Sequence, residues 1–161
     1  MQSVIIKLPA REPASRGYTL IELMVALTIA ALLFLVGYAS YREFIRRQAL
    51  DNTYKELKSD LKLAQQLALS GEKPSSCTGA LFGYQVAFAQ DSYTVSASCG
   101  GMVQVRTRSL SPGITLSGAN TILYKVIGEG TTLTGDISIT LTQTSTGRTK
   151  VLEITKEGTL K

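Results

Sequence analysis

One carboxylate stands at the edge of a long apolar stretch. After Glu22, the next charged residue along the chain is Arg42. An ionised side chain near the centre of a bilayer costs roughly 2.5–3.5 kcal/mol on insertion scales, and less near the end of a span. Glu22 therefore needs a cation as its partner or a position in the headgroup zone, where it would be only a tolerated boundary residue.

The apolar stretch has the length and composition of a membrane-spanning helix. It runs from Leu23 to Tyr41, and a helix of about 20 residues crosses a bilayer core of about 30 Å. The segment before it, Met1 to Gly17, is polar and basic and contains two prolines. We interpret residues 1–17 as a leader that belongs to targeting and not to the fold.

The boundary between leader and apolar stretch carries a compact motif, Gly17-Tyr18-Thr19-Leu20-Ile21-Glu22. It resembles the N-terminus of type IV prepilins and pseudopilins, in which a Gly precedes an aromatic-Thr-Leu-Ile-Glu box. The family usually has Phe where this chain has Tyr18. The resemblance covers about the first 70 residues. It implies that prepilin peptidase cuts between Gly17 and Tyr18, that the new N-terminus of Tyr18 is methylated, and that Glu22 acts in assembly.

Cleavage would give Glu22 a cationic partner. The free α-amino group of Tyr18 would have a reference pKa of about 7.7–8.0. It lies one helical turn before Glu22, so the carboxylate can meet its own amine or that of a neighbouring subunit. The resemblance implies the second pairing, which sets register in the filament.

A different processing route is open. Gly37-Tyr38-Ala39 is a small-x-small sequence after an apolar region, and ordinary signal peptidase would then cut before Ser40. The product would be a secreted β-domain binding protein. This route leaves a long segment containing Glu22 before the apolar run, and the motif at Gly17 would have no purpose.

The helix is expected to continue past the apolar stretch. From Tyr41 to Ser70 the pattern becomes amphipathic, and Gly71 follows as a stop signal. Its apolar stripe comprises Tyr54, Leu57, Leu61, Ala64 and Ala68, widened by Leu67. We predict one helix from about Thr19 to Ser70, about 78 Å long. The alternative is two helices with a loop near Arg42, and Gly37 and Ser40 are the softest points.

Residues 71–161 have the alternation of short β-strands. Phe82, Tyr84, Val86 and Phe88 alternate with smaller or polar residues, and a turn at 89–92 follows. Further strands are expected at 93–97, 102–106, 114–116, 122–126, 137–141 and 150–155. Because no crossover helix separates them, the sheet should be antiparallel. The fold class is therefore α+β, with a leader (1–17), an apolar half-helix (18–41), an amphipathic half-helix (42–70) and a β domain (71–161). The closing strands resemble the C-terminal part of GspH/FimT-type minor pilins and pseudopilins.

Two cysteines flank the first predicted hairpin. Cys77 precedes it and Cys99 follows it, so a turn near Gln90 brings the two thiols together. A disulfide that closes this loop would contribute about 3 kcal/mol and would persist outside the cytoplasm. The alternatives are free structural thiols or, less readily, metal or redox chemistry.

No catalytic constellation emerges from the sequence. The chain has no His, which removes the commonest general base and metal ligand. Its acidic residues in the β region are scattered among turns and strands, and no helix follows the glycines at 128, 130 and 135. We expect neither an enzyme nor a cofactor or metal site.

A modest basic cluster lies near the C-terminus and comprises Arg148, Lys150, Lys156 and Lys161. Some FimT-like minor pilins bind DNA through a Gly-Arg-x-Arg end. This chain has Gly158-Thr159-Leu160-Lys161 there, so one basic position is missing. Arg148, Lys150 and Lys161 are candidate DNA contacts, but phosphate binding needs several cations, and we favour a solvated face with no nucleic-acid partner.

The expected function is structural. The chain would be a minor pilin or pseudopilin that is inserted as a single-pass protein in the cytoplasmic membrane, with its β domain outside the cytoplasm. Its expected partners are membrane lipid, prepilin peptidase/methyltransferase, an inner-membrane assembly platform and other pilin subunits. Charge alone leaves the orientation open, because the leader and the segment after Tyr41 carry equal net positive charge. The runner-up functions are a DNA-binding minor pilin for DNA uptake and the secreted binding protein.

Overall fold

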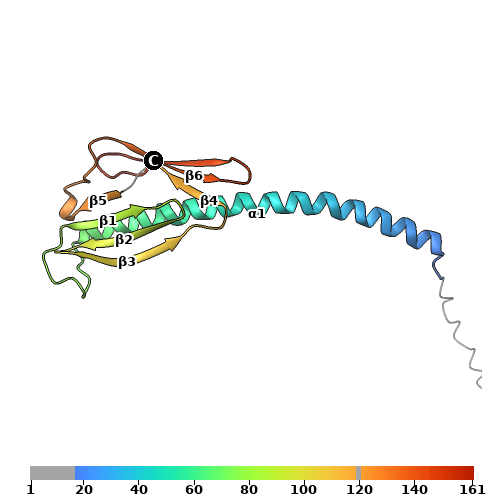
Figure 1. The fold of residues 1–161 in the computed structure, drawn as a ribbon, viewed down its shortest axis with the longest axis horizontal. Coiled ribbons are helices and arrows are strands. Elements are labelled where there is room, and N and C mark those ends of the chain that lie inside the picture. The colour runs from blue at the N-terminus through green and yellow to red at the C-terminus, as the bar shows by residue number, and fades with distance from the viewer. Residues whose placement is uncertain (1–16, 119–120) are drawn as a thin grey trace, which may run out of the picture. The chain divides into compact units, whose positions relative to one another are not determined.

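The computed structural model describes residues 17–118 and 121–161, and for Val36 and Ala39 only the backbone. The chain separates into two compact units, 1–41 and 42–161. Residues 1–16 of the predicted leader (1–17) lie outside the described residues. Helix α1 (Leu20–Ser70) belongs to both units, and the strands belong to the second (Figure 1). The strands are β1 (Gly83–Phe88), β2 (Ser92–Ser98), β3 (Met102–Ser109), β4 (Ile114–Ser117), β5 (Thr121–Lys125), β6 (Ile137–Gln143) and β7 (Thr149–Ile154).

Helix α1 is a single helix, as predicted. It is helical through Gly37 and Ser40, and no loop interrupts it near Arg42. It ends where the sequence predicts, because Gly71 takes a left-handed conformation with φ 63°, and its amide donates to the Ala68 carbonyl at 3.3 Å. Glycine terminates helices in this way because it has no Cβ to clash.

The strands form two antiparallel sheets. The larger sheet has the order β3-β2-β1-β5, and the smaller has the order β4-β6-β7. The hairpin of β1 and β2 turns at residues 89–91, with Phe88 opposite Tyr93. The Leu116 amide of β4 donates to the carbonyl of Gln90 in that turn at 2.8 Å, so the two sheets are tied together at one corner.

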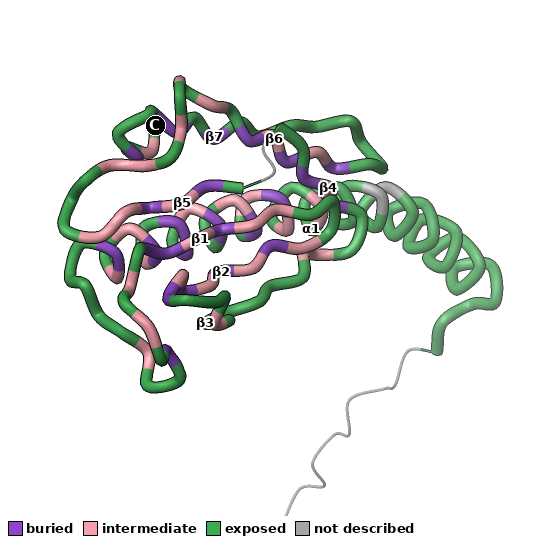
Figure 2. The backbone as a smooth tube through the Cα atoms, turned by 60° about the vertical axis from the view of Figure 1, so that its left-hand side comes forward, coloured by how far each residue is buried: buried purple, intermediate pink, exposed green. Residues whose placement is uncertain are grey.

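One core joins both sheets to the second half of α1. Leu57, Leu61 and Ala64 have no exposed surface, and they pack with inward-facing residues of both sheets (Figure 2). The predicted stripe is therefore the packing face of the helix. Tyr54 and Leu67 are only partly buried against this core. Two polar residues on the same stripe, Thr53 and Asp60, are buried as well.

The alternation predicted for the first strand is wrong at one position. Phe82 was expected to face the core, but its side chain is 59% exposed and β1 begins one residue later. At the next residue, a Cβ on Gly83 would lie 2.1 Å from the carbonyl oxygen of Tyr124, so β1 and β5 approach closely there.

Candidate functional site

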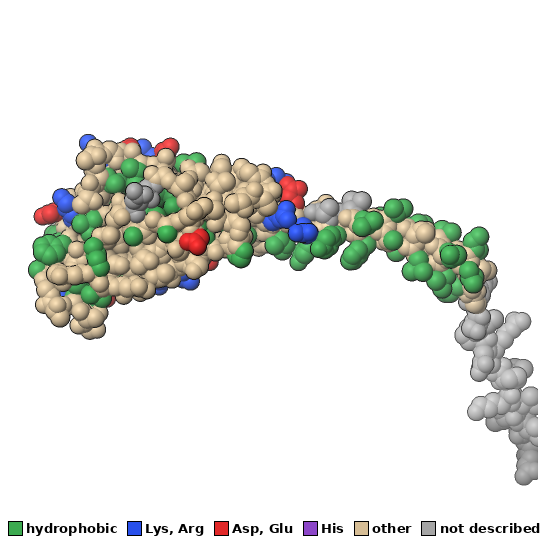
Figure 3. Space-filling model, in the orientation of Figure 1, with side chains coloured by type: hydrophobic (Ala, Val, Ile, Leu, Met, Phe, Trp, Pro, Cys, Tyr) green, Lys and Arg blue, Asp and Glu red, His purple; other side chains and the backbone are tan. Residues whose placement is uncertain are grey.

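The N-terminal segment presents apolar side chains on every side. In the first unit, every described side chain from Gly17 to Tyr41 is exposed, and hydrophobic side chains follow the helix along its length (Figure 3). By length and composition, α1 contains a stretch that can cross a membrane. A helix that is apolar all round is normally buried in a bilayer or among other helices, so this segment is built for a non-aqueous environment.

Glu22 has a local role in starting that helix. Thr19 is the residue before α1, and its Oγ1 accepts a hydrogen bond from the Glu22 amide at 3.3 Å. Thr-x-x-Glu is the sequence of a capping box, in which the N-cap hydroxyl satisfies one of the first free amides. A carboxylate in the first turn also interacts favourably with the helix dipole. The capping-box sequence can be recognised in Thr19-Leu20-Ile21-Glu22 itself, but it was not among the sequence predictions.

A comparison with protein-family models decides the identity of this segment. The model described as the prokaryotic N-terminal methylation motif matches residues 13–38. This segment is therefore similar to the N-terminus of type IV pilin-like proteins. No curated protein and no solved structure matches the chain.

The motif also accounts for the residues around the predicted cut. Proteins with this motif are processed by prepilin peptidase, and the predicted cleavage bond between Gly17 and Tyr18 lies inside the matched range. Tyr18 is 81% exposed. Among the residues that the structure describes, none lies within 4 Å of a Cβ on Gly17, so the described part of the fold does not itself require glycine at that position.

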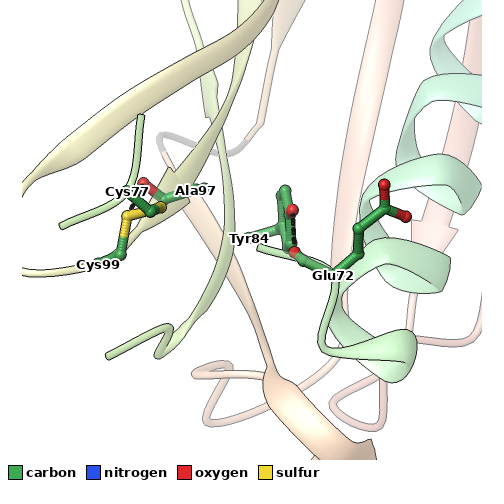
Figure 4. The surroundings of a disulfide bond; sticks show 5 residues. All are labelled: Glu72, Cys77, Tyr84, Ala97 and Cys99. Carbon is green, nitrogen blue, oxygen red and sulfur yellow. Dashed lines mark hydrogen bonds between the residues drawn. A yellow bond between two sulfur atoms is a disulfide. The ribbon is translucent and has the colours of Figure 1, made fainter. Parts of the chain in front are cut away.

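The predicted pairing of Cys77 with Cys99 is confirmed. The two residues form a disulfide with a Cα–Cα distance of 5.7 Å, and both are buried. Beside it, the Tyr84 hydroxyl donates to the Glu72 carbonyl at 2.5 Å (Figure 4). Burial raises the pKa of Tyr84, which keeps the hydroxyl protonated as a donor. The segment after α1 is therefore fastened to the hairpin of β1 and β2 at two points.

A buried carboxylate in the second unit was missed by the sequence analysis. Asp60 of α1 is 4% exposed, and its Oδ1 contacts the Arg106 guanidinium at 2.6 Å. Its Oδ2 accepts a hydrogen bond from the Tyr93 hydroxyl at 2.8 Å and lies 3.6 Å from Arg108. Burial and this bond to Asp60 raise the pKa of Tyr93. The signal was a charged residue three positions after Leu57, on the apolar stripe.

The structure divides the basic residues near the C-terminus into two groups. Arg148 contacts Glu43 at 2.8 Å, and Lys150 contacts Asp51 at 2.7 Å, so both lie against α1. The amide of Lys161 instead donates to the carbonyl of Glu153, near the far end of β7. Arg148 and Lys150 therefore lie beside α1, whereas the backbone of Lys161 lies beside that of Glu153. Whether Arg148, Lys150 or Lys161 contacts DNA stays an untested prediction.

Both carboxylates that face the first group are held ionised. Hydrogen bonding and charge from Arg47, with a contribution from Arg148, lower the pKa of Glu43. The hydrogen bond from Lys150 lowers the pKa of Asp51.

Within the described part of the chain, no group of three or more His, Cys, Asp or Glu side chains is arranged to hold a metal ion.

Proposed function

We propose that this protein is a structural subunit, a minor pilin or pseudopilin of the GspH/FimT type, of a filament assembled from the cytoplasmic membrane. After the cut at Gly17, the apolar half of α1 anchors the subunit in the bilayer and later packs among the same segments of other subunits. The proposal rests on the combination of the N-terminal methylation motif with the apolar half of α1, whose described side chains up to Tyr41 are all exposed.

The chemistry of assembly rests on Glu22 and on the N-terminal amine of Tyr18. Among residues 18–41, Glu22 is the one charged side chain, so the amine is the cation available to it at that depth. Pairing with the amine of a neighbouring subunit satisfies both charges in an environment where unpaired charge is costly. The same pairing would fix the axial position of each new subunit against the last.

Packing in the filament core would depend on close contact between helices. Within a membrane, apolar helices gain little from the hydrophobic effect, and small residues allow their backbones to approach. Ala26, Ala30, Ala31 and Gly37 supply small side chains on this helix. The β domain and its disulfide would remain outside the cytoplasm, where such bonds persist.

The test is to separate membrane insertion from filament assembly. Glu22→Gln removes the charge and keeps an amide that can serve in a capping box, whereas Thr19→Ala removes the cap hydrogen bond and keeps the charge. We expect Glu22→Gln to leave a normal or larger pool of processed protein in the membrane and to reduce the amount recovered in sheared filaments. Thr19→Ala should affect filaments much less.

Quantitative immunoblots of membrane and sheared fractions measure both amounts in one experiment. If Glu22→Gln assembles as well as the parent, the assembly role of Glu22 is refuted. If Thr19→Ala lowers filament recovery as strongly, assembly is equally sensitive to the start of α1, and the loss in Glu22→Gln is not specific to the charge.

A further inference from the structure

Three arginines follow the apolar half of α1 within two helical turns. Arg42 comes directly after Tyr41, and Arg46 and Arg47 follow one turn later. At a rise of 1.5 Å per residue, Arg47 lies only about 9 Å along the axis from Tyr41. Chain connectivity alone therefore keeps these three side chains close to the end of the apolar segment.

The tertiary structure adds two more cations to the same region. Arg148 and Lys150 come from the hairpin of β6 and β7, yet they reach Glu43 and Asp51 on the first turns of α1 after Arg42. We call the five residues Arg42, Arg46, Arg47, Arg148 and Lys150 the cationic collar. An open hollow of about 340 Å³ is lined by Arg47, Asp51, Arg148 and Lys150 with Leu50 and Thr149.

Two carboxylates, Glu43 and Asp51, face the collar, and they leave donors unused on the guanidiniums of Arg47 and Arg148. Arg47 and Arg148 both contact the same oxygen, Oε1 of Glu43. Each of these contacts uses one of the five N–H donors of a guanidinium. The side chains of Arg47 and Arg148 are 52% and 44% exposed. Exposed ion pairs of this kind are weak, so the unused donors of these guanidiniums can bind a second anion.

Aromatic residues mark the same end of the apolar segment. Tyr38, Tyr41 and Phe44 have 55%, 62% and 61% of their surface exposed. Tyrosines gather at the boundary between hydrocarbon and water, where an apolar ring and a polar hydroxyl are both accommodated. Aromatic side chains followed by arginines are the arrangement expected of a chain that leaves a bilayer through its headgroup layer.

We propose that the cationic collar binds the phosphate groups of anionic phospholipids while the subunit resides in the membrane. The proposal rests on membrane insertion by the proposed pilin-like subunit, but it does not require filament assembly. Juxtamembrane basic residues are attracted to anionic headgroups, and each strengthens binding by about five-fold. Arg148 and Lys150 would thereby seat the β6–β7 side of the domain on the bilayer surface.

The experiment measures lipid selectivity of the whole processed chain. The protein is reconstituted in phosphatidylcholine vesicles that contain a trace of spin-labelled phosphatidylglycerol or spin-labelled phosphatidylcholine, and the motionally restricted fraction gives a relative association constant. We expect several-fold selectivity for phosphatidylglycerol, weakening as salt is raised. Arg148→Gln with Lys150→Gln should bring the selectivity down toward that of phosphatidylcholine.

Two further variants separate lipid binding from a structural role. Lys156→Gln with Lys161→Gln removes the same charge at the other end of β7 and should leave selectivity unchanged. Glu43→Gln with Asp51→Asn breaks the same ion pairs from the opposite side, yet it should increase selectivity because it frees the collar. If the ion pairs only stabilise the fold, the Arg148/Lys150 variant and the Glu43/Asp51 variant should change lipid selectivity in the same direction.

Several outcomes would overturn the proposal. These are equal selectivity in the parent and in the Arg148/Lys150 variant, an equal loss in the Lys156/Lys161 variant, or a loss in the Glu43/Asp51 variant. A gel shift with a duplex oligonucleotide that depends on Arg148 and Lys150, while lipid selectivity does not, would assign the collar to nucleic acid instead. Failure of Glu22→Gln to alter filaments, with lipid selectivity intact, would refute only the assembly proposal.

Discussion

The two halves of α1 are parts of one helix built for two different solvents. From Gly17 to Tyr41 the described side chains are all exposed, and most are large and apolar. From Leu50 to Ala68, apolar side chains recur on one stripe and are buried under two sheets. The leucines are chemically identical in both halves, so the difference lies in their arrangement. An all-round apolar surface calls for lipid or other helices, whereas a single stripe calls for one packed face.

Charged residues follow the same division. Glu22 is the one charged side chain among residues 18–41. Asp60, by contrast, contacts Arg106, Arg108 and Tyr93 of its own chain. A buried charge must have a partner. The β domain supplies that partner internally, whereas in the proposed function the processed N-terminus supplies it to Glu22.

The largest effect is expected from Gly17→Leu at the boundary of the first region. Because a Cβ at Gly17 would meet no atom of residues 17–118 or 121–161 within 4 Å, the substitution should leave the fold intact and act through the peptidase alone. We expect complete loss of cleavage. Mass spectrometry of the membrane-bound protein should show the leader still attached, and a mature mass equal to that of the parent would remove the basis for prepilin processing.

A pair of leucine substitutions tests the contrast between the two halves directly. Leu61 has no exposed surface, and Leu27 is 61% exposed. Leu61→Ala should lower the free energy of unfolding of the β domain by about 2–5 kcal/mol, because it removes buried methyl groups and leaves a cavity. Leu27→Ala should not change it measurably. Denaturant titration followed by near-ultraviolet circular dichroism of the tyrosines measures both, and equal effects would contradict the division.

The disulfide is expected to contribute somewhat less to the free energy of unfolding than the most destabilising core truncations remove. Cys77 and Cys99 are 22 residues apart, and a loop of that length corresponds to about 3 kcal/mol in the chain-entropy model. Cys77→Ala with Cys99→Ala should lower the free energy of unfolding by about that amount and leave the apolar half unaffected. Peptide maps with and without reductant should differ by this one bridge, and two free thiols in protein from its native compartment would count against the extracytoplasmic domain.

The smallest effect concerns Tyr124 at high pH. Its hydroxyl is buried and has no hydrogen-bond partner among the residues that the structure describes, and burial raises its pKa to about 12. Below pH of about 10 the phenol is protonated in both states. Above that, the unfolded chain ionises first, so the free energy of unfolding falls by up to about 2–3 kcal/mol toward pH 12.

Tyr124→Phe should remove part of this pH dependence and leave stability near pH 7 unchanged or slightly higher, because an unpaired buried hydroxyl is lost. Tyr84 and Tyr93 also have raised pKa values, so some dependence should persist. Chemical denaturation at pH 8 and pH 11 measures the difference. Parallel curves for the parent and the variant would show that Tyr124 does not titrate in this range.

Local patterns were sufficient to predict most elements of this protein. The bounds of α1, the turn between β1 and β2, the positions of the strands and the Cys77–Cys99 pair followed from periodicity, from Gly71 and from sequence spacing. These features depend on interactions between residues near one another along the chain. The exposed position of Phe82 was not predicted, because the side on which a strand end is covered depends on elements that are distant in sequence.

The sequence by itself determined the N-terminal region, because the motif around Gly17, the capping sequence from Thr19 to Glu22 and the apolar helix all rest on residues within one or two turns of one another. Only the tertiary structure decided the partners of Asp60, Arg148 and Lys150. A side-chain charge does not indicate in the sequence which distant charge it will meet. The packing of two sheets on one face of α1 determined those pairs. The same packing placed Arg148 and Lys150, which come late in the sequence, beside Glu43 and Asp51.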